Sequence, residues 1–137
     1  MEQKGGLYVD LEVLEIEGLS NIYAVDAFRK EFIKAVHENW KNSPPFERYQ
    51  RKLIQDLAVL SVEKERAIDL PEFEKIKDTN GIYSIRHPET PMNVRILYYV
   101  SDGGEIILLT AFLEKNSGDY RNSIQRAEKR LSILLSE

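Results

Sequence analysis

The spacing of apolar positions changes along the chain, and each change predicts a different element. Residues 7–16 mix β-branched and apolar side chains with acids at alternating places, which predicts a strand. Over residues 25–40 the apolar positions move to steps of three and four, as in an amphipathic helix with a charged opposite side. Two prolines interrupt this pattern, and helical steps resume over residues 46–60. Because few residues separate the two helices, we expect an antiparallel helix hairpin.

The last 60 residues favour strands and then a helix. Residues 81–86 and 93–100 are rich in β-formers, and residues 105–113 form a long apolar run typical of a central strand. Asp102-Gly103-Gly104 supplies the positive φ of a tight turn before that run. The sequence therefore predicts a three-stranded antiparallel meander. A helix start at Asn116, with apolar residues at helical steps after it, predicts a final helix.

The predicted order is β-α-α-β-β-β-α. Residues 61–75 are charged and contain a proline, and we expect them to be mostly irregular. The order implies an α+β fold in which helices pack on an antiparallel sheet. A chain of 137 residues has the length of one domain, so residues 1–137 are interpreted as a single domain with an acidic N-terminal segment, residues 1–24.

Composition excludes several kinds of site. The chain has no cysteine, which excludes disulfides, thiol nucleophiles, cysteine-ligated zinc and iron–sulfur clusters. Its two histidines stand 50 positions apart, which argues against a histidine-rich metal site, so we expect no metal or cofactor. No apolar stretch approaches the roughly 18 residues of a membrane span, and the first six residues lack the apolar run of a secretory signal. We therefore expect a cytoplasmic protein with no membrane partner.

The charge is acidic but uneven. There are 19 basic and 23 acidic residues, a net charge of −4, which argues against a generic nucleic-acid binder. Residues 1–40 hold eight acids and four bases, so the remainder is neutral and can still carry a local basic patch.

Three cations of the predicted meander are candidates for such a patch. Side chains two apart on a strand share a face, which puts Arg86 with Ser84 on one strand and Arg95 with Leu97 on the next. If Arg86, Arg95 and Lys115 share the sheet face that the helix hairpin leaves uncovered, three cations converge there. Such a cluster suits a phosphate, because arginine binds phosphate in a bidentate fork. The alternative is an ordinary solvated sheet face on which single cations are common.

Four segments together resemble the RelE/HigB superfamily of toxins. The sequences at 81–86 (GIYSIR), 94–98 (VRILY) and 102–115 (DGGEIILLTAFLEK) follow the order and spacing of the family's G-L-Y-E-I/L-R, R-V/I-x-Y and D-G-x-I-V-L-L-H-x-F-x-K-K motifs. The sequence at 124–130 (IQRAEKR) is similar to the family's I-x-x-A-x-x-R helix. The resemblance covers about residues 70–131, and the preceding helix hairpin fits the family's architecture.

The resemblance implies a toxin of a type II toxin–antitoxin system that stops translation by cleaving mRNA on the ribosome. It implies a metal-independent attack of a ribose 2′-hydroxyl on the adjacent phosphate. Arg86, Arg95 and Lys115 match family positions of the basic active site, with Arg95 holding the phosphate and Lys115 as the candidate acid. We also consider Tyr120 and Arg121, near the start of the final helix, as RNA-binding residues. The implied partners are a cognate antitoxin, the ribosome and mRNA.

Departures from the family pattern leave alternatives open. Glu114 stands where the first lysine of the usual pair would be, and Thr110 replaces the common histidine. The acidic N-terminal segment is unusual for a protein that seeks ribosomes. One alternative is a non-catalytic binding module that kept the toxin fold, of phage origin or degenerate. Another is a gyrase-inhibiting, ParE-like toxin of the same fold.

Overall fold

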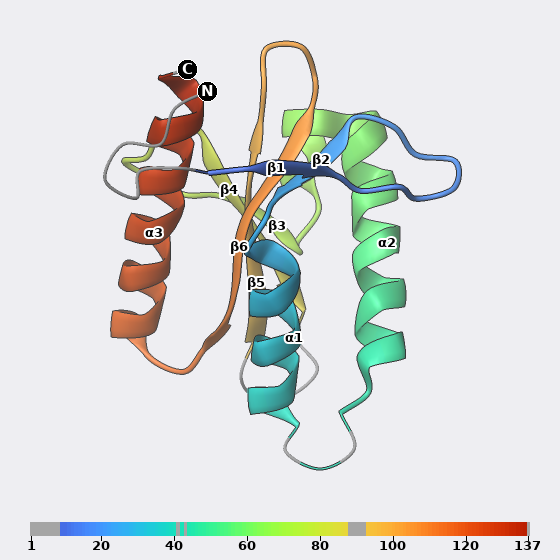
Figure 1. Cartoon of the computed structure of the whole chain (residues 1–137), viewed down its shortest axis with the longest axis vertical. Helices are drawn as coiled ribbons and strands as arrows, with labels where there is room; N and C mark the ends of the chain where they lie inside the picture. Colours follow the sequence, from blue (N-terminus) through green and yellow to red (C-terminus); the bar gives the residue numbers. More distant parts are fainter. Residues whose placement is uncertain (1–8, 41, 43, 88–92, 137) are drawn as a thin grey trace.

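A computed structural model describes residues 9–40, 42, 44–87 and 93–136 of the chain (Figure 1). In chain order the elements are β1 (Leu11–Val13), β2 (Ile22–Val25), α1 (Phe28–Asn39), α2 (Phe46–Glu63), the 3-10 helix η1 (Lys64–Asp69), β3 (Phe73–Lys75), β4 (Ile82–His87), β5 (Asn93–Val100), β6 (Ile106–Glu114) and α3 (Ser117–Leu135).

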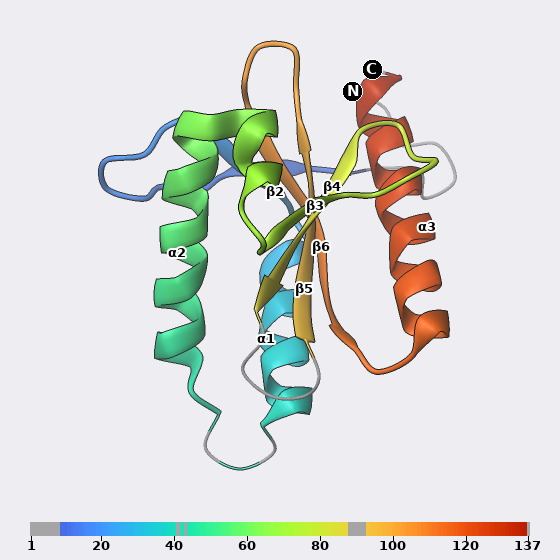
Figure 2. The same cartoon turned by 180° about the vertical axis from the view of Figure 1, so that it is seen from behind.

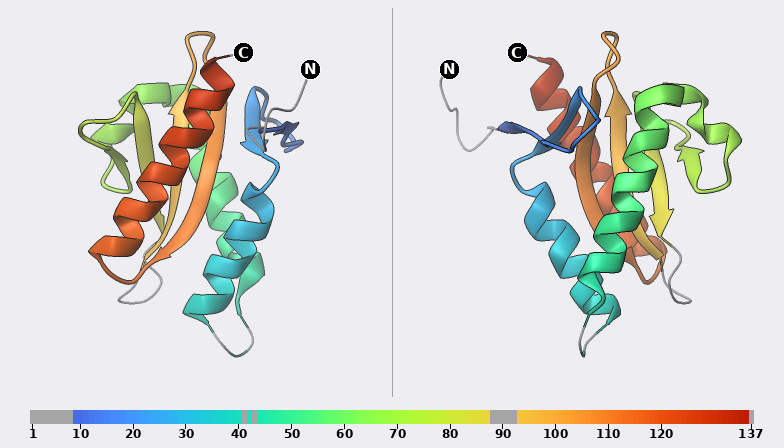
Figure 3. Two further views of the ribbon diagram at one scale, coloured as in Figure 1. Left: turned by 60° about the vertical axis from the view of Figure 1, so that its left-hand side comes forward. Right: turned by 90° about the vertical axis from the view of Figure 1, so that its right-hand side faces the viewer.

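All six strands belong to one sheet, in the order β1-β2-β6-β5-β4-β3. Neighbouring strands are antiparallel except β2 and β6, which are parallel, so the sheet is mixed. Helix α3 covers one face of the sheet, and α1 and α2 cover the other (Figure 3). Strands β3 and β4, at the edge far from β1, are clearest in the view from behind (Figure 2). The fold is therefore a three-layer α+β arrangement.

The helices and the meander of β4, β5 and β6 confirm the predictions made from apolar spacing. Asn116 caps α3 as expected, because its side-chain oxygen accepts a hydrogen bond from the backbone N–H of Asp119 at 2.9 Å. Gly104 has a φ of +85° in the turn before β6, a conformation that costs glycine little.

The N-terminal part and the segment before β4 differ from the prediction. The strand expected over residues 7–16 is confined to Leu11–Val13, and residues 7 and 8 lie outside the described part of the chain. Strands β2 and β3 were not predicted, and the expectation of a purely antiparallel sheet is wrong because β2 runs parallel to β6. Both missed strands have only three or four residues, too few for a period of two to stand out from the sequence. Strand β2 pairs with β6, more than 80 residues further along the chain, and β3 pairs with β4, the next strand.

Both faces of the central strands are buried. Leu97 and Tyr98 are neighbours on β5 and point to opposite faces, and neither has any exposed surface. On the α1–α2 face, the Tyr98 ring stacks on Tyr83 with the ring centres 5.4 Å apart. On the other face, the Thr110 hydroxyl accepts a hydrogen bond from Arg126 of α3, and Leu97 lies opposite Thr110 in the strand register. The face that the helix hairpin leaves uncovered is therefore covered by α3 in the middle of the sheet.

Helices α1 and α3 are joined by an ion pair that passes around the edge of β6. The Glu31 carboxylate on α1 accepts two hydrogen bonds from the Arg130 guanidinium on α3, at 2.8 and 2.7 Å. Arg130 also donates to the backbone carbonyl of Leu109 at 2.7 Å. The buried Thr110 hydroxyl donates to Glu31 at 2.7 Å and accepts from Arg126 at 3.1 Å. One carboxylate thus connects both helices with the central strand.

We expect removal of the Glu31 charge to destabilise the fold. In Glu31→Gln the Arg130 guanidinium keeps its partly buried position without a counter-charge, so the free energy of unfolding falls by about 2 kcal/mol. The matched control is Glu47→Gln on α2, whose ion pair with Arg51 is almost fully exposed, and there the loss stays within about 0.5 kcal/mol. Urea denaturation of the three proteins measures both values, and equal losses in the two variants would contradict this role of Glu31.

The same carboxylate gives the stability a pH dependence. Burial alone would raise the pKa of Glu31, but hydrogen bonds from Arg130 and Thr110 and the charges of Arg130 and Arg126 outweigh it and lower that pKa. A lowered pKa in the folded state stabilises the protein above the ordinary glutamate value of about 4.3, and this contribution is lost as the pH falls further. We expect the stability difference between wild type and Glu31→Gln to shrink below that value. A difference that does not depend on pH would contradict it.

Candidate functional site

Two of the predicted cations meet on the α3 face of the sheet. Strands β4 and β5 pair so that Arg86 lies directly opposite Arg95, and directly opposed residues of an antiparallel pair share a face. In the same register Arg95 lies opposite Phe112 of β6, and the helix α3 begins beyond the end of that strand. The geometry therefore confirms that Arg86 and Arg95 face the same side.

Arg95 is buried and is held by four neighbours from four elements. Its Nε donates to Glu114 at 2.7 Å, and its Nη1 donates to Glu74 at 3.1 Å and to the Ser84 hydroxyl at 2.9 Å. Its guanidinium carbon lies 4.9 Å from the ring centre of Tyr120 on α3, a cation–π distance. Only 8% of the residue is exposed. Arg95 therefore ties β3, β4, β6 and α3 together.

The two carboxylates decide what Arg95 can do. Burial alone would lower the pKa of Arg95, but the hydrogen bonds and charges of Glu114 and Glu74 outweigh it and raise that pKa. The guanidinium is thus charged and already paired, with little surface left for a phosphate. Its role is to position Glu74. It holds the Glu74 carboxylate, whose side chain is 54% exposed, on the edge strand β3 of this sheet face.

Arg86 is the cation of this pair that remains available. It is half-buried, and among the described residues its side chain makes one hydrogen bond, from Nη2 to the backbone carbonyl of Pro71 at 3.0 Å. A guanidinium has five N–H donors, so a single bond to a carbonyl leaves most of them for an anion. On β3, Glu74 lies opposite Ser84, two residues before Arg86 on β4. An exposed carboxylate and an arginine with free donors therefore border the same patch.

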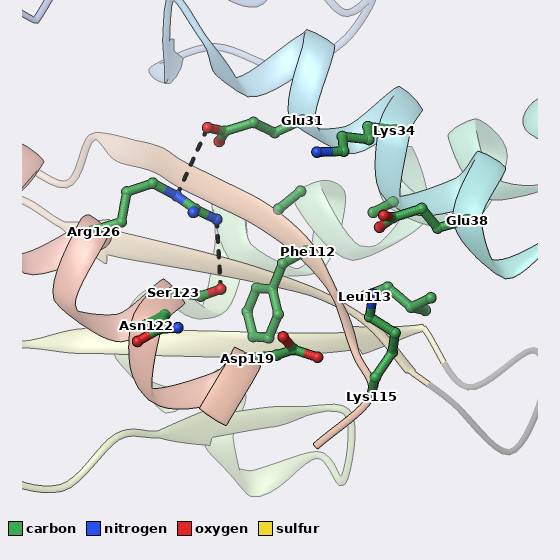
Figure 4. A pocket seen from close by; sticks show the side chains of 12 residues that line it. Glu31, Lys34, Glu38, Phe112, Leu113, Lys115, Asp119, Asn122, Ser123 and Arg126 are labelled. Atoms are coloured by element: carbon green, nitrogen blue, oxygen red, sulfur yellow. Dashed lines mark hydrogen bonds and ion pairs between the residues drawn. The ribbon is translucent and has the colours of Figure 1, made fainter. Parts of the chain in front are cut away.

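The structure does not bring Lys115 to these two arginines. Lys115 lies past the end of β6 in a pocket of about 340 Å³ between α1 and α3, with Lys34 and Glu38 of α1 (Figure 4). Glu114, next to it in the chain, points to Arg95 instead. Because successive side chains of a strand point to opposite faces, the residue that pairs with Arg95 and the lysine after it are separated. The predicted convergence of three cations is found for two of them.

Tyr120 and Arg121 take different positions at the start of α3. Tyr120 is half-buried between Arg95 and Phe112, whose ring centre is 6.1 Å from its own. Burial raises the pKa of its hydroxyl, and the opposing charge of Arg95 is outweighed. Arg121 is exposed to solvent. Tyr120 thus acts as a cover for Arg95, whereas Arg121 is free at the surface.

The site residue that sequence reasoning missed is Glu74. It belongs to the segment that was expected to be irregular, and only the register of β3 against β4 places it beside Ser84 and Arg95. Among the described residues, no group of three His, Asp or Glu side chains is placed to hold a metal ion. No helix in this part of the chain is long and apolar enough to cross a membrane.

Residues 39–132 match the family described as phage-derived protein Gp49-like (DUF891), which is about two thirds of the chain. The match runs from the end of α1 to the last turns of α3, so it includes Glu74, Arg86, Arg95 and Glu114. No curated protein and no solved structure is significantly similar to the chain.

Truncation of Arg95 tests its position as the centre of this site. We expect Arg95→Met, which keeps the packing volume, to lower the free energy of unfolding by about 3 kcal/mol, because Glu114 and the buried Ser84 hydroxyl lose their partner. The control Arg121→Met, at an exposed position on α3, should change it by less than about 0.5 kcal/mol. Denaturant titrations compare the two, and a neutral Arg95→Met would show that the carboxylates do not depend on it.

Proposed function

The chain belongs to the Gp49-like family of phage-derived proteins, which is part of the RelE/HigB-like toxin superfamily, and we propose that it is a toxin that cleaves mRNA on the ribosome. The family supports a toxin of a toxin–antitoxin system without assigning the RelE or HigB subtype. The mRNA-cleaving activity rests on one observation: Arg95 fixes the exposed Glu74 carboxylate on the sheet face that also carries Arg86.

Glu74 and Arg86 can together catalyse the attack of a ribose 2′-hydroxyl on the adjacent phosphate. Glu74 accepts the proton from the 2′-hydroxyl as its oxygen forms a bond to the adjacent phosphorus. Arg86 stabilises the negative charge that develops on the phosphate oxygens, and the bond from phosphorus to the 5′-oxygen breaks. Water or a ribosomal group protonates that leaving oxygen. In this arrangement Arg95 is a positioning residue, and Lys115 is not assigned a step because the pocket that it lines includes neither Glu74 nor Arg86.

The charge of the protein favours a substrate that is delivered by a larger partner. With a net charge of −4 and two carboxylates next to Arg95, the protein has little general attraction for RNA. The ribosome holds mRNA in place and thereby supplies what the acidic surface lacks. Arg121, exposed at the start of α3, is proposed to contact the RNA backbone, and Tyr120 to hold Arg95 beneath it. A cognate antitoxin is proposed to cover this face.

A second candidate function follows from the same carboxylates. Glu74 and Glu114 neutralise Arg95, which in a nuclease would be expected to meet the phosphate directly. A binding module that kept the toxin fold and lost catalysis would have this charge balance. Such a protein would bind a protein partner through the α3 face and leave transcripts intact.

Induced expression with mapping of transcript 5′ ends separates these functions. We expect growth arrest and new 5′ ends within coding sequences for wild type. Loss of the base in Glu74→Gln should reduce cleavage by a factor of about 10² to 10⁴. Loss of the phosphate contact in Arg86→Met should reduce it by about 10² to 10³. Lys129→Met, an exposed substitution on α3, is the control and should cleave like wild type.

The folding of each variant and its RNA-cleaving activity are measured separately in this experiment. Circular dichroism and denaturation confirm that each variant is folded before its activity is compared. Growth arrest without new 5′ ends would favour the binding module, and damaged DNA instead of cleaved RNA would indicate a gyrase poison. Full cleavage by both Glu74→Gln and Arg86→Met would show that the assigned site is wrong.

A further inference from the structure

The C-terminal part of β6, residues 109–114, has no strand paired to its outer edge among the described residues. Strand β2 pairs with β6 only along Ile106–Leu108, whereas β6 continues to Glu114 and pairs with β5 on its other side throughout. Within the part of the chain that the structure describes, no strand lies beside residues 109–114 on the outer side. An unpaired row of backbone groups is a template for the addition of another strand.

The direction of the free backbone groups follows from one hydrogen bond. The carbonyl of Leu109 points outward, because it accepts from Arg130 and not from a strand. The pairing of β5 with β6 shifts by one residue between Leu97 and Tyr98. After this shift, the backbone N–H and C=O groups of the odd-numbered residues of β6 point away from β5, toward the outer edge. Ala111 and Leu113 therefore direct their N–H and C=O groups to the outer edge.

This edge forms the floor of the pocket that contains Lys115, which we call the edge slot (Figure 4). Its walls are α1, with Lys34 and Glu38, and α3, with Asp119 and Arg126. At about 340 Å³ its volume lies in the range of ligand sites. A floor of free backbone groups between two helices accommodates an extended chain.

The edge slot is closed at one end. There the Glu31 carboxylate bridges to Arg130 and, at 3.7 Å, to Arg126, so an inserted chain cannot pass between α1 and α3. The other end, which we call the open end, is bordered by Glu38, Lys115 and Asp119, and among the described residues no ion pair joins α1 and α3 there. A slot with one closed end accepts the terminus of a chain, and a chain that enters with its carboxyl end first runs antiparallel to β6.

The charges along the edge slot differ between its two ends. At the closed end two cations, Arg126 and Arg130, share the single carboxylate of Glu31, and Lys34 lies about one helical turn further along α1. Lys34 has no ion-pair partner among the described residues, so a positive charge is available for a terminal carboxylate.

At the open end Glu38 and Asp119 outnumber Lys115. The Oδ2 atom of Asp119 is buried and has no hydrogen-bond partner among the described residues, and Glu38 has no ion-pair partner among them either. A buried carboxylate oxygen without a donor is costly, and a cationic side chain of a bound chain would supply the donor.

The two charged ends are separated by a distance that a short peptide spans. From Asp119 to Arg126 the helix α3 rises by seven residues, about 10 Å. Three residues of an extended strand cover about the same distance. A terminal carboxylate at the closed end therefore places the side chain two or three residues before it between Glu38 and Asp119.

We propose that the edge slot binds the extended carboxyl terminus of a partner protein, added antiparallel to β6. The terminal carboxylate lies by Lys34 and Arg126, and a lysine or arginine two or three residues before the end lies by Glu38 and Asp119. Backbone groups of Ala111 and Leu113 pair with alternate residues of the bound chain. This site is separate from the α3 face that carries Arg86, and the proposal does not depend on RNA cleavage.

The first test uses peptides and leaves the protein unchanged. A library of N-acetylated octapeptides, random in the last six positions, is prepared as free acids and as carboxyl-terminal amides and selected on the full-length protein. We expect the selected free acids to carry lysine or arginine two or three positions before the end. Their amides should bind at least tenfold more weakly. N-methylation of alternate backbone amides should weaken binding at least tenfold, while methylation of the amides between them should have little effect.

The second test assigns the contacts by matched variants. Lys34→Met should remove most of the preference for the free acid, and Glu38→Gln should remove the preference for a basic residue near the end. Lys30→Met on α1 and Lys129→Met on α3 remove exposed charges outside the edge slot and should bind like wild type. Amide shifts of Ala111 and Leu113 on titration with the best free acid would report the edge pairing.

Three results would overturn the proposal. They are a library without any binding sequence, equal binding of free acids and amides, and N-methylation effects that do not alternate. Loss of RNA cleavage in Glu74→Gln with peptide binding intact would confirm that the edge slot and the proposed nuclease site are independent.

Discussion

The arrangement of the helices depends on the hydrogen bonds that satisfy the backbone at the edge of β6 where its pairing with β2 ends. The parallel pairing stops at Leu108, and the next outward carbonyl, that of Leu109, needs another donor. Arg130 supplies it and at the same time binds Glu31 in a bidentate ion pair. A charge-assisted bond of this kind is about twice as strong as a neutral one, and here it joins helices on opposite faces of the sheet.

The position of α3 that results decides what lies on each side of β6. On the sheet face, Tyr120 covers Arg95, and Phe112 and Glu114 reach the same cluster. On the outer edge, Ala111 and Leu113 form the floor of the edge slot. Alternation along a single strand therefore serves two neighbouring surfaces, and Phe112, which contacts Tyr120 and also lines the edge slot, lies between them.

Arg95 and Arg86 differ in their ion pairs: Arg95 is paired with two carboxylates and has a structural role, whereas Arg86 has donors for a ligand. Arg95 is surrounded by Glu74, Glu114, Ser84 and Tyr120, so its loss disturbs four elements at once. Arg86, its neighbour across the strands, makes one side-chain hydrogen bond within the described part of the chain, to a carbonyl, and has further donors for an anion. The acidic balance of the chain is thus not only a property of its N-terminal part; two acids also determine the character of the candidate site.

Local patterns in the sequence determined the three helices, the meander and the common face of Arg86 and Arg95, because periods of 3.6 and 2 and turn glycines act between near neighbours. The resemblance over about residues 70–131 likewise lies within the family match over residues 39–132. Only the tertiary structure decided the strands β2 and β3, the burial of Arg95, the place of Lys115 and the role of Glu74. They depend on contacts between separate elements, from about 20 residues apart for Arg95 with Glu74 and Glu114 to more than 80 for β2 with β6, and no local pattern of apolar and polar residues encodes such pairs.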